Sequence, residues 1–307
     1  MAAAVRSEAA TDAHGPRANG GTVAAIEQKL WSGCIPVVFS LHASEVTTLH
    51  APRPFYAMIP RMSYLVAQTR EVVEYFRDAA PPFGGLQGAQ IWFEAPGGTP
   101  LKWHLPFGVL WDTLGGANEA SVLPWPITVH FQSFPSEELL PCENEKSIEI
   151  HFMHSLKQAT FLRSGSTKVI MGMPEAQQSQ IWTSVIKNDY QSYREATKEL
   201  QLEVNDRASS SNPLRMLPIR VHVDKEPAIQ MPIAPFSNGD EGQEKTLHDV
   251  LGYLLPDLFP SQIECKVVVH GIPVPPEVSV LSLYRNFAYP DGFLYVSVVP
   301  RHQPNNV

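Results

Sequence analysis

The chain has 307 residues and a formal net charge of −8 at pH 7. Hydrophobic residues make up 44% of it, so its length and composition allow two or three domains with sizeable cores. Lys and Arg do not cluster, which argues against a nucleic-acid binder, because such a protein presents a basic face. The three cysteines, Cys34, Cys142 and Cys265, lie far apart without a CxxC pair. This pattern predicts neither a disulfide framework nor a zinc ribbon and fits a reducing, cytoplasmic location.

The first 25 residues are rich in Ala, Gly, Ser and Thr and lack the apolar centre of a signal peptide, so we expect residues 1–25 to form a disordered tail. No apolar run approaches the 18 or more residues of a membrane span. Because the chain also lacks a polybasic patch, any membrane association is expected to be peripheral and to depend on partners.

Residues 26–135 show the pattern of a first mixed domain. Apolar, β-branched runs predict strands, and apolar residues at three- and four-residue spacing predict helices. The expected strands are 35–41, 55–60, 89–93, 101–104 and 127–131, and the expected helices are 26–31, 64–77 and 106–114.

Residues 214–300 repeat this plan. The expected strands are 219–223, 229–233, 265–269 and 293–299, and the expected helices are 246–255 and 278–283. Both halves run hairpin, helix, strand, glycine- or proline-containing turn, short helix and strand, which is the order of a ubiquitin-like β-grasp fold. An internal repeat of this kind decides the fold. We therefore predict an α+β protein with two ubiquitin-like β-grasp domains flanking a helix-rich domain.

The middle of the chain, residues 140–202, is expected to be helical, and the polar residues 203–213 are expected to form a linker. In the first helix, 144–164, apolar residues recur at helical spacing and mark its buried face: Ile148, Phe152, Leu156, Ala159 and Leu162. Asn144 is the expected N-cap and Gly165 the expected stop. Pro174 is expected to start a second helix, and Asn188 or Asp189 to cap a third.

Lys157 lies beside this buried stripe, about 100° around the helix axis from Leu156. Its helical neighbours are Met153, His154, Thr160 and Phe161, and none of them is a carboxylate. A lysine in this position can be a snorkelling side chain whose stem covers apolar surface. It can also be an amine left free for another protein to bond to.

The sequence gives little support for catalysis. Cys142 precedes a helix, but Glu143 and Glu145 flank it and disfavour the reactive thiolate. His151 and His154 have a usable metal spacing, yet no further ligands stand nearby in the sequence to complete a site. The glycine pairs at 84–85, 97–98 and 115–116 lack the context of a phosphate-binding loop and predict turns. We expect no active site, no cofactor and no metal site.

Several motifs resemble the autophagy protein 5 family. They are PRMSYL (60–65), IWFE (91–94), PLKWHLPFGVLWD (100–112), LPWPITVHF (123–131), EIHFMHSLKQATFLRSGS (149–166) and QSQIWTSVIKNDYQSY (178–193). The resemblance covers roughly residues 26–300, and that family has the same three modules in the same order.

The resemblance implies a non-enzymatic scaffold of autophagosome formation. In that family a lysine at the position of Lys157 accepts the carboxyl terminus of the ubiquitin-like autophagy protein 12, which autophagy protein 10 transfers. The conjugate binds a helix of autophagy protein 16, recruits autophagy protein 3, and acts like an E3 in attaching autophagy protein 8 to phosphatidylethanolamine. This implies a peripheral location on the phagophore assembly site membrane and no nucleic-acid partner.

The resemblance also assigns Arg61 and Tyr64 to the surface near the autophagy protein 16 groove, although simple core packing is an alternative for Tyr64. Four tryptophans of the first half, Trp92, Trp103, Trp111 and Trp125, are expected to pack its core. The sequence ends PRHQPNNV, without the terminal glycine of a conjugated modifier, so we expect an acceptor and not a donor. The competing interpretation is a tandem ubiquitin-like interaction module without covalent modification.

Overall fold

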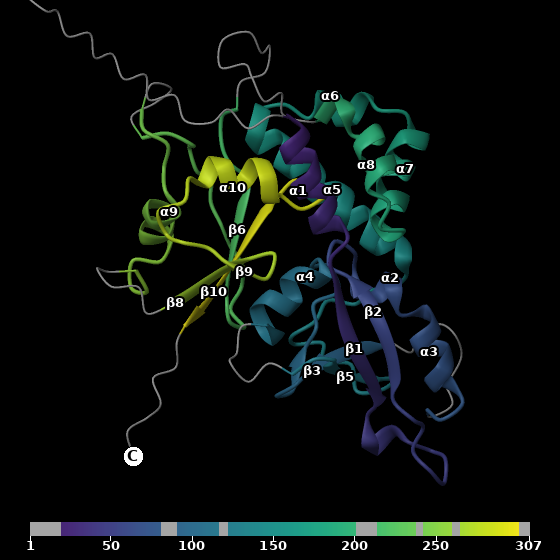
Figure 1. Cartoon of the computed structure of the whole chain (residues 1–307). Coiled ribbons are helices and arrows are strands. Elements are labelled where there is room, and N and C mark those ends of the chain that lie inside the picture. The colour runs from purple at the N-terminus through teal and green to yellow at the C-terminus, as the bar shows by residue number, and fades with distance from the viewer. Residues whose placement is uncertain are drawn as a thin grey trace, which may run out of the picture.

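The computed structural model describes residues 20–80, 91–116, 122–200, 214–237, 242–259 and 265–300. Within these residues, two mixed sheets form neighbouring domains, and a helical region lies above the first of them (Figure 1). The predictions for residues 1–19, for the glycine pair at 84–85 and for the linker 203–213 lie outside the described residues. Helix α1 (Gly20–Trp31) begins six residues earlier than expected, so residues 20–25 are helical and do not belong to a disordered tail.

The first sheet has the strand order β2-β1-β5-β3-β4. Its strands are β1 (Cys34–Leu41), β2 (Phe55–Pro60), β3 (Trp92–Ala95), β4 (Thr99–Pro100) and β5 (Trp125–His130). Strands β1 and β5 pair in parallel at the centre, and antiparallel partners lie outside them. The first and last strands of a β-grasp domain meet in this way, so the predicted fold is confirmed.

Helices cover this sheet. They are η1 (Ala43–Glu45), α2 (Leu65–Gln68), α3 (Arg70–Arg77) and α4 (Phe107–Leu110), the last continued by a π-helical turn, η2 (Trp111–Gly115). The expected helix 64–77 is divided at Thr69, whose φ of −110° and ψ of 15° lie outside the helical region. Val72 and Phe76 of α3 face the sheet and are almost fully buried.

The second sheet repeats the first, with the strand order β7-β6-β10-β8-β9. Its strands are β6 (Ile219–Val223), β7 (Ile229–Gln230), β8 (Cys265–Val269), β9 (Ile272–Pro273) and β10 (Leu294–Pro300), and its helices are α9 (Leu247–Leu254) and α10 (Val280–Phe287). Strands β6 and β10 are again parallel. Thr246 and Asp249 form a capping box that fixes the start of α9.

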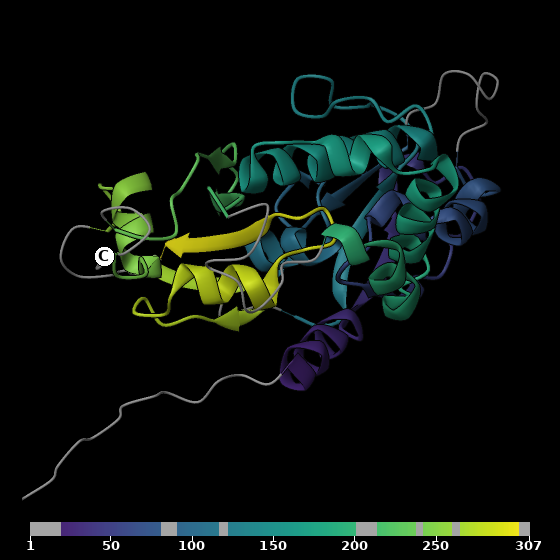
Figure 2. The same cartoon turned by 90° about the horizontal axis from the view of Figure 1, so that it is seen from above.

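The helical region consists of α5 (Glu145–Ser164), α6 (Lys168–Gly172), α7 (Glu175–Ile186), α8 (Tyr190–Ala196) and a final turn, η3 (Lys198–Leu200). Helix α6 was not expected from the sequence. Asp189, one of the two predicted caps, accepts a hydrogen bond from the Ser192 N–H and begins α8. Seen from above, the teal helix α5 runs from the green segments of the second sheet's domain toward the blue and purple first domain (Figure 2).

The packing joins the helical region to the first domain. Ile148 and Phe152 of α5 belong to the same apolar cluster as the interior of the first sheet. The second domain has its own core. Three of its aromatic residues do not belong to that core and pack instead into the apolar cluster shared by the first domain and the helical region: Tyr289, Phe293 and Tyr295. The three sequence modules therefore form two cores, and α5 lies where these two cores meet.

Candidate functional site

The ends of α5 are fixed by the residues that the sequence indicated. The Asn144 side chain accepts a hydrogen bond from the Ser147 N–H at 3.2 Å, which satisfies a free donor at the helix start. At the other end Gly165 has a φ of 76°, a left-handed conformation that glycine adopts without steric cost. The predicted stripe is confirmed, with four of its five residues buried and Leu162 partly buried. The other side of α5 therefore faces solvent.

Lys157 lies on this outer side within a stripe of four residues spaced four, three and four apart. The stripe is Ile150, His154, Lys157 and Phe161. Ile150 is 47% exposed and Phe161 is 55% exposed, so two large apolar side chains lie on the same exposed stripe as Lys157. Lys157 is partly buried, and none of the described residues forms a hydrogen bond or ion pair with its amine. The amine is thus available to another molecule, with exposed apolar side chains along the same helix face.

The residues next to Lys157 are held by the second domain. Arg220 of β6 donates hydrogen bonds to the Ser155 hydroxyl at 3.4 Å and to the Gln158 side-chain oxygen at 3.2 Å. These two residues precede and follow the pair Leu156–Lys157 in the chain. The second domain therefore fixes the position of α5 at the turn that carries Lys157.

Arg220 is itself held by a buried polar network. Its Nη1 donates to the Tyr295 hydroxyl at 2.8 Å and lies 3.7 Å from the Asp291 carboxylate, and its guanidinium stacks 3.7 Å above the Phe293 ring. Burial alone would lower the pKa of Arg220, but the neighbouring Tyr295 and Asp291 reverse this effect and raise it. Arg220 therefore stays charged and keeps its contacts.

Arg61 lies in a second link between the domains and not on an open surface. Its side chain is 11% exposed, and Nη2 lies 2.6 Å from each carboxylate oxygen of Asp112. Asp112 also accepts a hydrogen bond from the Gly271 N–H of the second domain at 2.9 Å. Burial raises the pKa of Asp112, and Arg61 opposes that shift. Binding of a partner by Arg61 remains a prediction.

Tyr64 is 2% exposed. Its ring packs against Phe152 of α5 and Trp182 of α7, with centroid distances of 6.3 and 5.7 Å. The assignment of Tyr64 to a partner-binding surface is therefore corrected, and the core-packing alternative describes this side chain. The physical reason is that the first domain and the helical region bury this position between them.

A groove of about 390 Å³ lies where the three modules meet. Its apolar lining comes from α1, from the turn after β2, from α5 and α8, and from the second domain, and includes Trp31, Met62, Leu156, Tyr193 and Tyr289. Four charged residues also line the groove, three of them basic and one acidic: Arg163, Arg194, Arg285 and Glu27. The groove therefore combines an apolar floor with a mainly basic rim.

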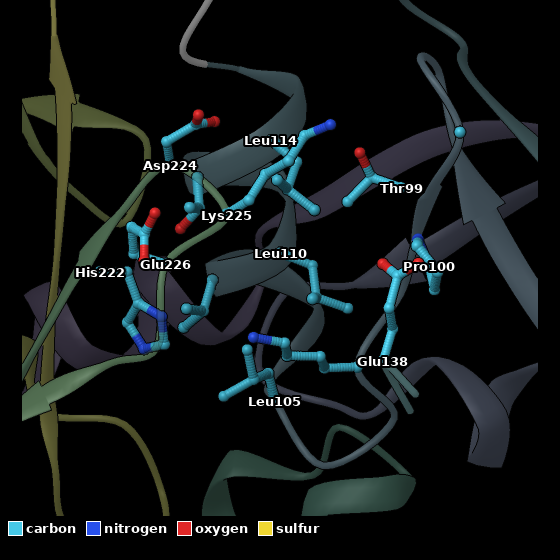
Figure 3. Close-up of a pocket in the computed structure, with 14 residues that line it drawn as sticks. Thr99, Pro100, Leu105, Leu110, Leu114, Glu138, His222, Asp224, Lys225 and Glu226 are labelled. Carbon is cyan, nitrogen blue, oxygen red and sulfur yellow. The ribbon is translucent and has the colours of Figure 1, made fainter. Parts of the chain in front are cut away.

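A smaller cavity of about 100 Å³ lies between the two ubiquitin-like domains (Figure 3). Leu105, Leu110 and Leu114 of the first domain face His222 of β6 across it. His222 is 5% exposed and its Nε2 has no hydrogen-bond partner among the described residues. Burial, followed by the charge of Arg220, lowers the pKa of His222 to about 3. His222 is therefore a neutral ring beside unfilled space.

The geometry does not support a catalytic role for Cys142 or a metal site formed by His151 and His154. Burial raises the pKa of Cys142 to about 11, which disfavours a nucleophilic thiolate. His151 lies with its ring 5.0 Å from that of His104, whereas His154 is exposed, so they do not converge on one ligand position. Trp92, Trp111 and Trp125 are buried as expected. Trp103 is only partly buried and donates to the Leu140 carbonyl.

Two β-grasp domains of identical strand order, joined through a helix whose Lys157 has no partner among the described residues, define a tandem ubiquitin-like scaffold protein. Family models agree module by module: "Autophagy protein ATG5, UblA domain" matches residues 30–131, "Autophagy protein ATG5, alpha-helical bundle region" matches 145–203, and "Autophagy protein ATG5, UblB domain" matches 216–298.

Curated relatives extend this agreement over nearly the whole chain. Autophagy protein 5 of Aspergillus oryzae is 30% identical over 322 residues, covering 90% of this chain and 97% of the relative. Autophagy protein 5 of Phaeosphaeria nodorum is 29% identical over 309 residues, covering 89% and 96%. The chain therefore belongs to the autophagy protein 5 family, and its role lies in autophagy.

Two further comparisons show how far the similarity to autophagy protein 5 extends in sequence and in structure. Autophagy protein 5 of Arabidopsis thaliana is 36% identical over 189 residues, which cover 60% of this chain and 54% of the relative, so this match spans about half of the plant protein. The crystal structure of Kluyveromyces marxianus Atg5 has a TM-score of 0.73 at 23% identity, covering 89% of this chain and 98% of that one. It supports the fold. Among the described helices, none has the length and apolar character needed to cross a membrane.

Proposed function

We propose that this protein accepts the carboxyl terminus of the ubiquitin-like autophagy protein 12 on the ε-amine of Lys157. The observation that carries the proposal is the free amine of Lys157 on an outer face of α5, held in place by Arg220 of the second domain. Membership in the autophagy protein 5 family supports the proposal, because the resemblance of the α5 sequence to that family implies an acceptor lysine at the position of Lys157.

The bond-forming step requires little chemistry from this chain. The neutral Lys157 amine attacks the thioester carbonyl through which autophagy protein 10 carries the modifier. An isopeptide N–C bond forms, the C–S bond breaks, the enzyme thiolate leaves, and the amine nitrogen gives up a proton. The conjugating enzyme supplies the activated acyl group, so the acceptor contributes position and access.

The groove where the modules meet suits a helix of autophagy protein 16. Its floor is apolar, its rim is mainly basic, and it is contributed by all three modules. An amphipathic helix lays its apolar side chains into such a groove, and acidic residues on its flanks would face Arg163 and Arg285. A helix bound there would hold the modules in one arrangement.

In this proposal the protein is a scaffold that contributes no catalytic residue. The conjugate recruits autophagy protein 3 and promotes transfer of autophagy protein 8 to phosphatidylethanolamine. The protein is cytoplasmic and reaches the phagophore assembly site membrane as a peripheral component through its partners. The isolated protein should therefore not sediment with phosphatidylethanolamine-containing liposomes, whereas the assembled conjugate should.

Lys157→Arg tests the acceptor assignment in a reconstituted conjugation reaction followed on a reducing denaturing gel. Arg keeps the charge and stem but cannot supply a neutral amine at working pH. The matched control is Lys146→Arg on the same helix, where Lys146 is exposed and paired with Glu149. The shifted band should disappear only with Lys157→Arg. Equal shifts for all proteins would place the acceptor elsewhere, and no shift with the wild type would favour an interaction module without covalent modification.

Arg285→Glu tests the groove. Arg285 is exposed on α10 and makes no hydrogen bond or ion pair with the described residues, so its reversal should leave the fold intact. Affinity for an acidic autophagy protein 16 helix, measured by fluorescence anisotropy, should fall at least tenfold. Arg70→Glu on α3, outside the groove lining, is the matched control and should bind normally. Equal affinities of the two variants would remove the helix from this groove.

A further inference from the structure

A group of three metal-ligating side chains lies in the first domain, away from α5. His42 follows β1, His130 ends β5, and Glu45 lies in the short helix η1 that follows His42. The parallel register of β1 and β5 brings His42 beside His130, since the His42 N–H donates to the Val129 carbonyl. This end of β1 points away from the helical region (Figure 1).

We propose that His42, Glu45 and His130 form a binding site for a single divalent zinc ion. One nitrogen or carboxylate oxygen from each residue lies within 4.8 Å of the others. His130 Nδ1 lies 3.3 Å from Glu45 Oε1. Two ligands of a tetrahedral zinc ion at bond lengths near 2.0–2.1 Å are about 3.3 Å apart, so this pair already has the spacing of a zinc site.

The surroundings of His130 are those of a metal-binding histidine. Its second ring nitrogen, Nε2, lies 3.1 Å from the Glu94 carboxylate, but the orientation of the two groups does not make a hydrogen bond, so Nε2 is a buried polar atom with an acceptor already beside it. A ligating histidine usually directs its other nitrogen to a carboxylate, which orients the ring and raises the basicity of the ligand atom. The ring is also stacked on Trp92, with a centroid distance of 3.8 Å and an angle of 9° between the planes. His130 is therefore held in place before any ion binds.

The other two ligands differ in exposure. Glu45 is 5% exposed, and its Oε2 accepts a hydrogen bond from the Phe131 N–H at 2.6 Å, which leaves Oε1 on the side of His130. His42 is partly exposed, stacks on His130 at 4.6 Å, and contacts the Ser44 hydroxyl through Nδ1. An ion can reach the site past His42, and a small rotation of that ring would complete a third bond. Water would fill the fourth position.

The donor set indicates the kind of ion. Two imidazoles and one carboxylate suit zinc and related transition metals, whereas Mg²⁺ and Ca²⁺ prefer oxygen ligands alone. None of the residues of this site lines the groove or belongs to the Lys157 stripe. Zinc would tie η1 to the ends of β1 and β5. Zinc binding at these residues would be independent of conjugation at Lys157.

The experiment uses the full chain without an affinity tag, stripped of metal by a chelator and dialysed. Zn²⁺ is titrated against a chromophoric competitor, and Co²⁺ replaces it in a second titration that reports tetrahedral ligand-field absorption. We expect one equivalent of Zn²⁺ per chain and no competition by Mg²⁺. His42→Ala is the decisive variant, because His42 is partly exposed and its loss leaves the core intact; affinity should fall at least tenfold.

Two further variants complete the test. Glu94→Gln should weaken binding by about tenfold while keeping one equivalent, because the Glu94 charge lies beside His130 Nε2 and does not itself bind the ion. His151→Ala is the matched control, since the His151 ring lies 5.0 Å from that of His104 and takes no part in the group formed by His42, Glu45 and His130. It should bind as the wild type does. Absence of stoichiometric binding, or unchanged affinity in His42→Ala, would overturn the proposal.

Discussion

Asp112 receives the Arg61 guanidinium through both of its carboxylate oxygens, each 2.6 Å from Nη2. The same carboxylate accepts the Gly271 N–H from the turn between β8 and β9. One buried ion pair of the first domain therefore holds the backbone of the second. The next residue, Thr113, adds a second contact between the domains, because its hydroxyl lies 2.9 Å from the Ser297 hydroxyl of β10.

Asp112→Asn should destabilise the protein by about 3–5 kcal/mol, the cost of leaving a buried charge such as that of Arg61 without its counter-ion. Asn keeps the shape and an acceptor for Gly271 but loses the negative charge. Urea unfolding at pH 7 measures the change. Glu74→Gln is the matched control, because the Glu74–Arg77 pair is exposed and should contribute less than about 1 kcal/mol. Similar effects of the two substitutions would show that the buried pair has no special role in stability.

Phe161→Ser should slow conjugation without changing the fold. Phe161 lies one helical turn after Lys157 and is 55% exposed, so a modifier bonded to Lys157 would cover its ring. We expect the rate at limiting modifier concentration to fall several-fold while the thermal unfolding midpoint stays within about 2 °C. Met171→Ser on α6, where Met171 is 64% exposed, is the control and should conjugate normally. If both variants react like the wild type, the apolar residues beside Lys157 do not contact the modifier.

Much of the fold could be predicted because it follows local rules. Strands 55–60, 219–223 and 265–269 have the predicted bounds, and Asn144, Thr246 and Gly165 end or begin helices as expected. The second hairpin strand of the first domain was placed at 101–104 but lies at Thr99–Pro100, because the chain turns toward α4 directly after it. The early start of α1 was missed because its glycines weaken the local helical signal.

The site was only partly accessible from the sequence. Lys157 could be placed on a helix shoulder by spacing, but the exposure of Phe161 and the contacts of Arg220 depend on how two distant domains pack. One signal for Arg220 was present: it is a charged residue within the β-branched strand IRVHV. Tyr64 could not be placed by pattern, since its burial depends on Trp182, more than a hundred residues later.

Gly292→Ala should loosen the contact between α5 and the second domain. Gly292 has a φ of 82°, and an added Cβ would lie 2.9 Å from the Ala159 side chain on α5. The left-handed backbone alone costs about 1–2 kcal/mol for a residue with a side chain, and the steric contact adds to it. Urea unfolding measures the loss. Gly252→Ala in α9 is the control, because nothing lies within 4 Å of its added Cβ and alanine favours a helix. An equally large loss of stability in this control would contradict the contact between Gly292 and α5.

His222→Phe should reduce the loss of stability in acid. Burial, together with Arg220, Lys102 and His104, lowers the pKa of His222 to about 3 in the folded protein, against 6.5 for an ordinary histidine. Between these values the unfolded chain binds the extra proton, so folding stability falls as the pH decreases from about 6.5 toward 3. For one group, the free energy of unfolding falls by at most about 1.4 kcal/mol per pH unit, which amounts to roughly 2 kcal/mol between pH 6.5 and pH 5.

Phenylalanine removes this titration, and the cavity beside His222 leaves room for its ring (Figure 3). Urea unfolding at pH 7 and pH 5 should show that the variant loses about 2 kcal/mol less stability than the wild type over this interval. Carboxylates contribute equally to both proteins, so their effect cancels in the comparison. If His222→Phe keeps the wild-type pH dependence, His222 is protonated in the folded protein at pH 5, and the assignment of a neutral, buried ring is wrong.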